Sequence, residues 1–129
     1  MGEVPPLHVL LVEDSADDAA LLERHLRRDG QEVVLHRVDS AGGLRQALAA
    51  PGWDVVLCDY AMPGFSGMEA LELLHEHALD IPFIFVSGRM GEDVAVDAMR
   101  AGAADYITKG SLKRLVPAIQ REVRDARIR

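Results

Sequence analysis

The sequence predicts an α/β fold in which helices cover both faces of a parallel β-sheet. Five apolar runs rich in β-branched residues alternate along the chain with five amphipathic segments. This alternation is typical of a parallel sheet with helices packed on each side. The 129 residues suffice for one domain with a substantial buried core. We therefore expect a single domain over residues 1–129, with residues 1–6 as an N-terminal tail.

Each apolar run corresponds to one expected strand. The strands lie near Leu7–Val12, Val33–Val38, Asp54–Cys58, Pro82–Val86 and Asp105–Ile107. The third run contains the sequence VVLC, which shows no alternation of apolar and polar residues. A strand of this kind has both faces buried. The third strand is therefore expected at the centre of the sheet.

Several helix starts carry side chains that satisfy free backbone N–H groups. Ser15 with Asp18, and Ser66 with Glu69, have the spacing of capping boxes, in which a hydroxyl and a carboxylate each accept one backbone hydrogen bond. Two further serines are expected as N-caps. These are Ser40 and Ser111.

Two glycines and a proline bear on where helices end and begin. Gly30 and Gly102 suit the left-handed position directly after a helix. The last amphipathic segment carries apolar residues at helical spacing from Leu112 onward, and it contains Pro117. A proline inside a helix removes one backbone hydrogen bond, so the helix either begins near Val116 or kinks there.

Composition and charge exclude several classes of protein. The net charge of −7 disfavours general nucleic-acid binding, and no direct binding of nucleic acid is expected. Residues 109–129 nevertheless carry a net charge of +5, which suits either a solvated terminal helix or contact with an acidic partner or a nucleic acid. No run is long enough to span a membrane, and the N-terminus does not resemble a signal peptide. The single Cys58 fits a reducing cytoplasm.

Charged or hydroxyl groups follow or close four of the apolar runs. They are Glu13 and Asp14 after the first run, Asp59 after the third, Ser87 at the end of the fourth and Lys109 after the fifth. In an open parallel sheet all strand C-termini emerge along one edge, where ligands gather. These residues are therefore expected to meet in one cleft. A group of three carboxylates, one hydroxyl and one ammonium is what binding a divalent cation together with a phosphoryl group requires.

The acidic residues of this set predict a metal site. Asp59 closes the most buried strand, where an ionised carboxylate is costly unless a positive charge lies beside it. Right-handed crossovers place the first strand, with Glu13 and Asp14, next to the third. Mg²⁺ prefers oxygen ligands and would relieve the repulsion among three carboxylates, and Mn²⁺ is a second candidate ion. The alternative is that Asp14 only caps the following helix, but Ser15 already offers a cap.

The chain resembles the receiver domain of two-component response regulators, the CheY-like family, along essentially its whole length. The matching elements are Glu13-Asp14, Asp59 followed by Met62-Pro63-Gly64 and Gly67, Ser87-Gly88, and Gly102-Ala103-x-Asp105-Tyr106-x-x-Lys109. Each element alone is weak, but together and in order they are highly specific. The resemblance implies a flavodoxin-like (βα)₅ three-layer sandwich whose five parallel strands have the order 2-1-3-4-5.

The resemblance also implies a role for each site residue. Asp59 would be the phosphoacceptor, attacking the phosphorus of a phosphohistidine or of a small phosphodonor. Asp14 and Asp59 would bind Mg²⁺ directly, together with the backbone carbonyl of Ala61, while Glu13 would act through water. Lys109 and Ser87 would hold phosphoryl oxygens. Such a site works by positioning and charge neutralisation.

A conformational switch is implied by the same resemblance. Phosphorylation would draw Ser87 inward, and the aromatic side chain of Tyr106 would turn toward the vacated space; the alternative is that Tyr106 only fills the core. The output surface would consist of the fourth helix, the fifth strand and the fifth helix. A sensor histidine kinase or a histidine phosphotransfer protein would be the phosphodonor partner, and a homodimer through that surface is one expected use of it. No membrane partner is expected.

The sequence departs from the family pattern at Gly110 and Gly88, and two further positions bear on the lifetime of the phosphoryl group in this family. Gly110 follows Lys109 where the family usually has a proline, commonly after a cis bond, so a trans bond is expected here because a non-proline cis bond costs about 2.5–4 kcal/mol. Gly88 stands where alanine is common and adds backbone freedom. Ala61 and Arg89 occupy positions that tune the lifetime of the phosphoryl group.

Other functions fit less well. A haloacid-dehalogenase-like phosphatase needs a second Asp two positions after its nucleophile, where Ala61 stands, and a dinucleotide-binding domain needs a glycine-rich turn after the first strand. The expected function is thus a regulatory domain that assists its own phosphorylation and dephosphorylation and is not a turnover enzyme on external substrates. The alternative is a receiver-like docking or dimerisation module that is never phosphorylated. The domain is either a complete regulator or a part of a larger kinase or regulator.

Overall fold

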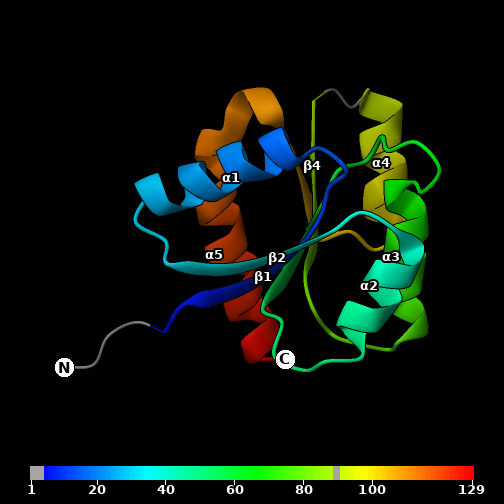
Figure 1. Ribbon diagram of the computed structural model, residues 1–129, viewed down its shortest axis with the longest axis horizontal. Helices are drawn as coiled ribbons and strands as arrows, with labels where there is room; N and C mark the ends of the chain where they lie inside the picture. Colours follow the sequence, from blue (N-terminus) through cyan, green and yellow to red (C-terminus); the bar gives the residue numbers. More distant parts are fainter. Residues whose placement is uncertain (1–4, 89–90) are drawn as a thin grey trace.

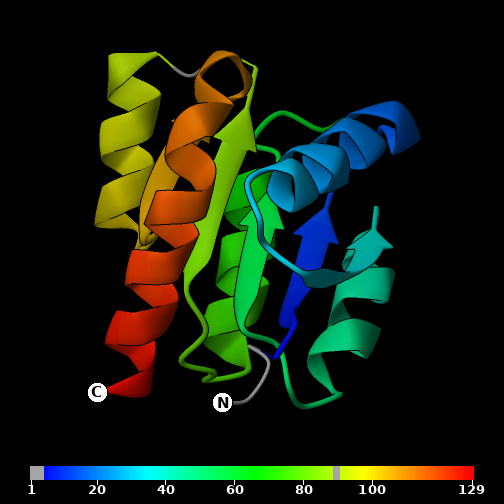
Figure 2. The ribbon, with the colours of Figure 1, turned by 90° about the vertical axis from the view of Figure 1, so that its left-hand side faces the viewer.

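The structure, a computed structural model, describes residues 5–88 and 91–129. Its five strands form one parallel sheet of order β2-β1-β3-β4-β5. Helices α1 and α5 cover one face of this sheet, and α2, α3 and α4 cover the other (Figures 1 and 2). The three-layer sandwich and the strand order implied by the sequence are therefore confirmed.

Strands and helices alternate along the whole described chain. In chain order they are β1 (Leu7–Val12), α1 (Ala16–Arg28), β2 (Val33–Val38), α2 (Ala41–Leu48), β3 (Val55–Cys58), α3 (Gly67–Glu76), β4 (Phe83–Ser87), α4 (Glu92–Arg100), β5 (Asp105–Thr108), the 3₁₀ helix η1 (Lys109–Arg114) and α5 (Leu115–Arg127). The third strand begins at Val55, one residue later than expected. The fourth is shifted by one residue, to end at Ser87, and the fifth extends to Thr108.

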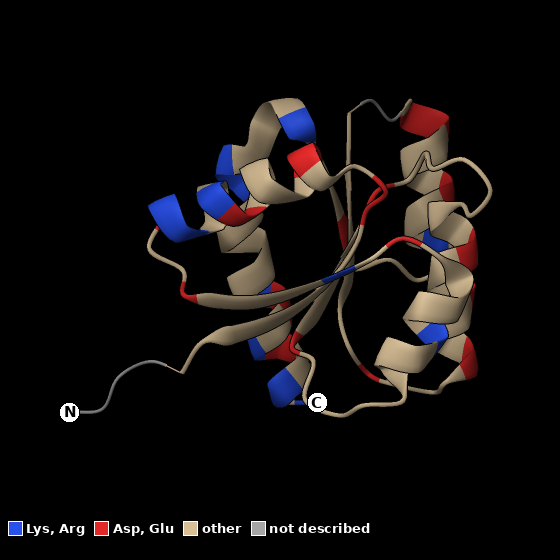
Figure 3. Ribbon diagram, viewed as in Figure 1, with Lys and Arg blue, Asp and Glu red and all other residues tan. Residues whose placement is uncertain are grey.

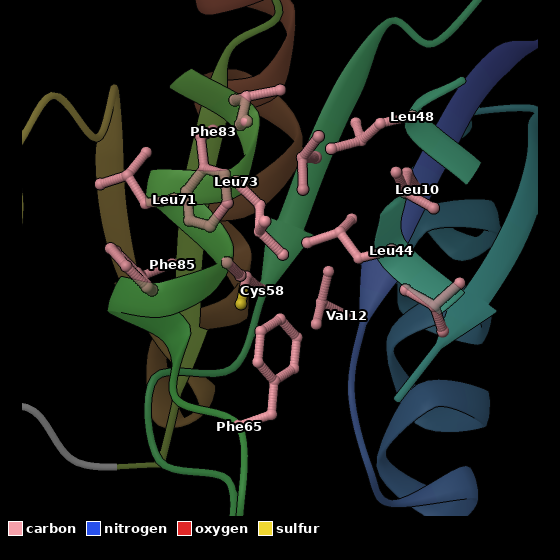
Figure 4. Packing of buried hydrophobic residues seen from close by; sticks show 14 of the residues in the cluster. Leu10, Val12, Leu44, Leu48, Cys58, Phe65, Leu71, Leu73, Phe83 and Phe85 are labelled. Carbon is pink, nitrogen blue, oxygen red and sulfur yellow. The ribbon is translucent and has the colours of Figure 1, made fainter. Parts of the chain in front are cut away.

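The centre of the sheet is buried on both faces, as the pattern of the third strand predicts. All four residues of β3 are at most 1% exposed. On one side of the sheet Leu10, Val12 and Phe65 belong to the same buried cluster as Phe83 and Phe85, and these side chains fill the space between the sheet and α2 and α3 (Figure 4). A second buried cluster lies beneath α1 and α5. Packing on both faces fixes the strand ends that carry the site.

The predicted serine caps are confirmed at three helices. The hydroxyl of Ser15 accepts a hydrogen bond from the Asp18 backbone N–H at 3.1 Å, and Ser66 and Ser40 cap α3 and α2 in the same way. The carboxylate half of the first capping box is not formed. The Ser15 backbone N–H donates to Glu13 at 3.3 Å instead, and the Asp18 carboxylate is engaged elsewhere.

The expectation that Ser111 caps the last helix is wrong. Ser111 lies inside η1 with non-helical backbone angles, φ −128° and ψ 43°, and α5 begins only at Leu115. Pro117 is then the third residue of α5, where its missing N–H would have no partner in the helix anyway. The alternative that the helix begins near Val116 is confirmed. Gly30 and Gly102 have positive φ angles of 83° and 107°, as expected for residues that follow a helix.

The basic residues of the C-terminal segment form ion pairs within the domain. Arg121 contacts the buried Asp105 at 3.0 Å, Arg127 contacts Asp54 at 3.2 Å, and Arg129 contacts Asp80. Figure 3 shows Lys and Arg gathered on the side of the molecule formed by α1, η1 and α5. These contacts favour the interpretation of this segment as a solvated helix. Within the described ranges, no helix combines the length and the apolar character needed to cross a membrane.

Candidate functional site: an acidic cluster beside Lys109

The C-terminal ends of β1 and β3 bring three carboxylates together. The two strands pair directly, with Val12 opposite Cys58, so the residues that follow them are neighbours. Glu13, Asp14 and Asp59 each offer a carboxylate oxygen within 4.8 Å of the others. The structure therefore confirms that these three residues meet at one edge. Glu13 and Asp59 are buried, and Asp14 is exposed.

Burial and the neighbouring carboxylate both favour the protonated form of Glu13. Burial raises the pKa of Glu13 above its usual range, and the nearby charge of Asp59 raises it further. The hydrogen bonds from Lys109 and from the Ser15 backbone N–H lower the pKa of Glu13 but do not cancel the increase. A cluster of oxygen donors with excess negative charge fits a hard divalent cation such as Mg²⁺. The same oxygen donors also suit Mn²⁺.

Lys109 supplies the positive charge of the site. Its Nζ atom lies 2.7 Å from Asp18, 3.0 Å from Glu13 and 3.6 Å from Asp59. Partial burial would lower the pKa of Lys109, but its hydrogen bonds to Asp18 and Glu13 outweigh burial and raise the pKa. The ammonium group is therefore firmly charged. The predicted proximity of Lys109 to Asp59 is confirmed.

Asp18 is a member of the site that the sequence did not reveal. Its carboxylate accepts the shortest hydrogen bond of Lys109, although the two residues are 91 positions apart. The capping-box spacing assigns this carboxylate to the local helix end. One feature of the sequence could have indicated this role. Asp18 lies in the first turn of the helix that follows β1, and this turn begins at the edge of the sheet where the site is expected.

Ser87 and Tyr106 lie on the neighbouring strands. Ser87 is the last residue of β4, is buried, and stands opposite Thr108 of β5. It is thus at the same end of the sheet as Asp59 and Lys109. Tyr106, opposite Phe85, is half-buried against the core cluster. Its position at the margin between the core and the groove beside α4 suits either a switch or a core residue.

The loop after β3 is held close to the site by Gly67. The Gly67 backbone N–H donates to the Tyr60 carbonyl at 3.0 Å. A Cβ atom at Gly67 would lie 2.8 Å from the carbonyl oxygen of Asp59 and 2.6 Å from the Phe85 ring. No side chain fits in this space. Ala61 lies in the same loop and is exposed, and the role of its carbonyl stays a prediction.

The segment after Lys109 lacks the proline that receiver domains usually have directly after this lysine. The described chain contains no cis peptide bond, so Lys109–Gly110 is trans as expected. Gly110 begins the 3₁₀ helix with Lys109, and the ring Nε2 of His25 lies 2.8 Å from the Leu112 carbonyl oxygen. Helix α1 therefore holds η1 in place. Arg89, named as a residue that tunes the phosphoryl lifetime, lies outside the described residues.

Comparison with known proteins identifies the family. The family model of the response regulator receiver domain matches residues 9–120. The chain belongs to this family. The receiver domain is 38% identical, over 101 residues, to the C4-dicarboxylate transport transcriptional regulatory protein DctD of Pseudomonas aeruginosa. This match covers 78% of the domain and 21% of DctD. It is likewise 38% identical, over 101 residues, to the transcriptional regulatory protein PrrA of Mycobacterium tuberculosis, covering 78% of the domain and 42% of PrrA.

Solved structures agree with the fold of the receiver domain. The crystal structure of FixJ-N is 31% identical with a TM-score of 0.78, and the match covers 94% of the domain and 96% of FixJ-N. A response regulator receiver domain protein from Clostridium thermocellum is 27% identical with a TM-score of 0.80, over 95% and 98% of the two chains. The chain spans less than half the length of the curated relatives DctD and PrrA. As a receiver domain of two-component systems, it has a regulatory role.

Proposed function

We propose that residues 1–129 form one receiver domain that accepts a phosphoryl group on Asp59. The observation that supports this most directly is the convergence of three carboxylates and one ammonium group at the C-terminal edge of the sheet. Asp59 is the member of the set that directly follows the central, fully buried β3. Lys109 lies within ion-pair distance of it.

The chemical step is an in-line transfer between two weak nucleophiles. A carboxylate oxygen of Asp59 attacks phosphorus, an acyl phosphate bond forms, and the bond from phosphorus to the imidazole nitrogen of a phosphohistidine breaks. The imidazole takes up the electron pair and then a proton from solvent. Lys109 and the Ser87 hydroxyl bind phosphoryl oxygens, where negative charge accumulates. Water later hydrolyses the acyl phosphate, which releases inorganic phosphate and returns Asp59 to its carboxylate form. The domain is proposed to assist these two steps on its own Asp59 and not to act as a turnover enzyme on external substrates.

The three carboxylates have the chemistry to hold a divalent cation. Asp14 and Asp59 are proposed as direct ligands, Glu13 as a ligand through water, and the Ala61 carbonyl as a further ligand. Mg²⁺, or Mn²⁺ in its place, neutralises phosphoryl oxygens when it is bound. The close approach of the carboxylate oxygens of Glu13, Asp14 and Asp59 supports this assignment, because a divalent cation would offset the repulsion among them.

Partners follow from the same chemistry. A sensor histidine kinase or a histidine phosphotransfer protein is proposed as the phosphodonor. The output is proposed to pass from Ser87 and Tyr106 to the surface of α4, β5 and α5, where a partner or a second copy docks. Two apolar side chains on α4, Val96 and Met99, are 42% and 43% exposed and border Tyr106 there. The single thiol of Cys58 fits a reducing cytoplasm.

Intact mass spectrometry after incubation with acetyl phosphate and Mg²⁺ tests the proposal. We expect one phosphoryl adduct on the wild type, and no adduct on Asp59→Asn or after chelation of the metal. Asp17→Asn removes an exposed carboxylate outside the cluster and should still give the adduct. Beryllofluoride binding distinguishes rapid hydrolysis from failure to react. A wild type that neither gains the adduct nor binds beryllofluoride would contradict the proposal and favour a docking module.

A further inference from the structure

The ammonium group of Lys109 is shared unequally among three carboxylates. It donates hydrogen bonds to Asp18 at 2.7 Å and to Glu13 at 3.0 Å. The nearest oxygen of Asp59 is 3.6 Å away, which is an ion-pair distance and not a hydrogen bond. The ammonium group of Lys109 therefore lies closer to Asp18 than to Asp59, the proposed acceptor.

Among the described residues, the Asp18 carboxylate hydrogen-bonds only to Lys109. Ser15 caps α1 with its hydroxyl, and the Ser15 backbone N–H donates to Glu13. Asp18 is also the more exposed of the two hydrogen-bonded partners of Lys109. Its side chain is 42% exposed, compared with 4% for Glu13. Glu13 is thus a fixed partner of Lys109, while Asp18 is a partner that water can replace.

The surroundings let the Lys109 side chain move while its backbone stays in place. His25, seven residues after Asp18 on α1, holds the Leu112 carbonyl of η1 at 2.8 Å. A cavity of about 190 Å³ lies between α1 and η1, beside Lys109 and lined by Leu11, Leu22 and Leu112. Asp18 and Glu13 also line this cavity, whereas Asp59 does not. The Lys109 side chain therefore has free space next to its bond with Asp18.

We propose that Asp18 competes with the phosphoryl group on Asp59 for Lys109, and so lowers the affinity of the site for that group. This inference rests on the proposed function. An ammonium group has three N–H donors, and two of them already point to Asp18 and Glu13. A phosphoryl group brings close to two negative charges and strong acceptor oxygens. When Asp59 is phosphorylated, Lys109 gives up its hydrogen bond to the partly exposed Asp18 and binds the phosphoryl group instead.

The affinity of the domain for beryllofluoride, a phosphoryl analogue, tests the competition directly. Binding is followed by ¹⁹F NMR at saturating Mg²⁺. Asp18→Asn keeps the shape of the side chain and removes its charge, so we expect beryllofluoride to bind about threefold to tenfold more tightly. Asp17→Asn is the matched control. It removes the same charge from the same turn of α1, but Asp17 is exposed and forms no ion pair with any other described residue. The beryllofluoride affinity of this variant should therefore stay within about twofold of the wild type.

A second comparison separates competition from a general effect on the fold. In a Lys109→Gln background there is no ammonium group to share, so Asp18→Asn should change beryllofluoride affinity by less than about twofold. Thermal unfolding of each variant verifies that it is folded.

Three outcomes would overturn the inference: unchanged or weaker binding by Asp18→Asn, an equal gain in Asp17→Asn, or a gain that persists without Lys109. If the wild type itself fails to bind beryllofluoride, the proposed function fails, and the inference fails with it. Wild-type binding with no effect of Asp18→Asn overturns the inference alone.

Discussion

Gly67 lies so close to Asp59 that a Cβ atom at position 67 would stand 2.8 Å from the Asp59 carbonyl oxygen. The same atom would stand 2.6 Å from the ring of Phe85. The start of α3 is thereby packed directly against the backbone of the proposed acceptor. A side chain at position 67 must displace either the acceptor or the core.

Gly67→Ala is therefore expected to destabilise the domain by about 1–3 kcal/mol through overpacking. It should also slow phosphorylation, because Asp59 would move relative to Lys109. Chemical denaturation and the mass assay measure the two effects. Gly42→Ala is the matched control, since a Cβ atom at Gly42 of α2 meets nothing within 4 Å. That control should stabilise the domain by about 0.5–1 kcal/mol. Equal effects of the two substitutions would show that the space at Gly67 is not limiting.

Asp14→Asn is expected to weaken Mg²⁺ binding by about tenfold or more, because a hard cation loses one of three clustered carboxylates. Calorimetric titration with Mg²⁺ provides the measurement. Asp17→Asn again serves as the control, since it removes an exposed acidic residue outside the cluster. An unchanged affinity in Asp14→Asn would remove that residue from the metal site.

Ser87→Ala is expected to permit phosphorylation of Asp59 but to prevent the conformational response at α4 and Tyr106. The side chain is buried, and the loss of its hydroxyl should cost about 1 kcal/mol or less of stability. The variant should still accept the phosphoryl group on Asp59. In NMR spectra, however, the beryllofluoride-induced shifts at Val96, Met99 and Tyr106 should largely disappear. Ser87→Thr keeps the hydroxyl and should retain the shifts; a full response in Ser87→Ala would rule out the hydroxyl switch.

Cys58 is expected to resist alkylation while the domain is folded. Its side chain is fully buried, and burial raises the pKa of the thiol, with Asp59 and Glu13 adding to the increase. The thiolate that reacts with iodoacetamide is therefore scarce as well as inaccessible at pH 8. We expect labelling at least about a hundredfold slower than in denaturant, as followed by intact mass. Rapid labelling without unfolding would show that β3 opens locally.

The fold could be predicted because each strand is a short apolar run bounded by clear turn or cap residues. Every strand boundary was placed within one residue, including the central β3, whose lack of polar alternation reflects burial on both faces. The acidic cluster was predictable for a related reason. Parallel strands end at one edge, so the residues that follow β1 and β3 had to be neighbours.

Two details could not be predicted, because tertiary contacts decide them. Ser111 precedes an apolar helical segment and looks like an N-cap, but η1 extends to Arg114 and is held against α1 through Leu112 and His25. Asp18 has the spacing of a local cap, yet its carboxylate binds Lys109 from the other end of the chain. A local pattern contains no information about a partner 91 positions away.

The separation of Glu13 and Lys109 by 96 positions has a consequence for a protein made from its N-terminus onward. The ribosome adds Asp59 well before it adds Lys109. A growing chain thus carries the proposed acceptor before it carries the ammonium group that lies beside it in the folded domain. The proposed site can be complete only after Lys109, which follows β5, has been added and has reached this edge of the sheet.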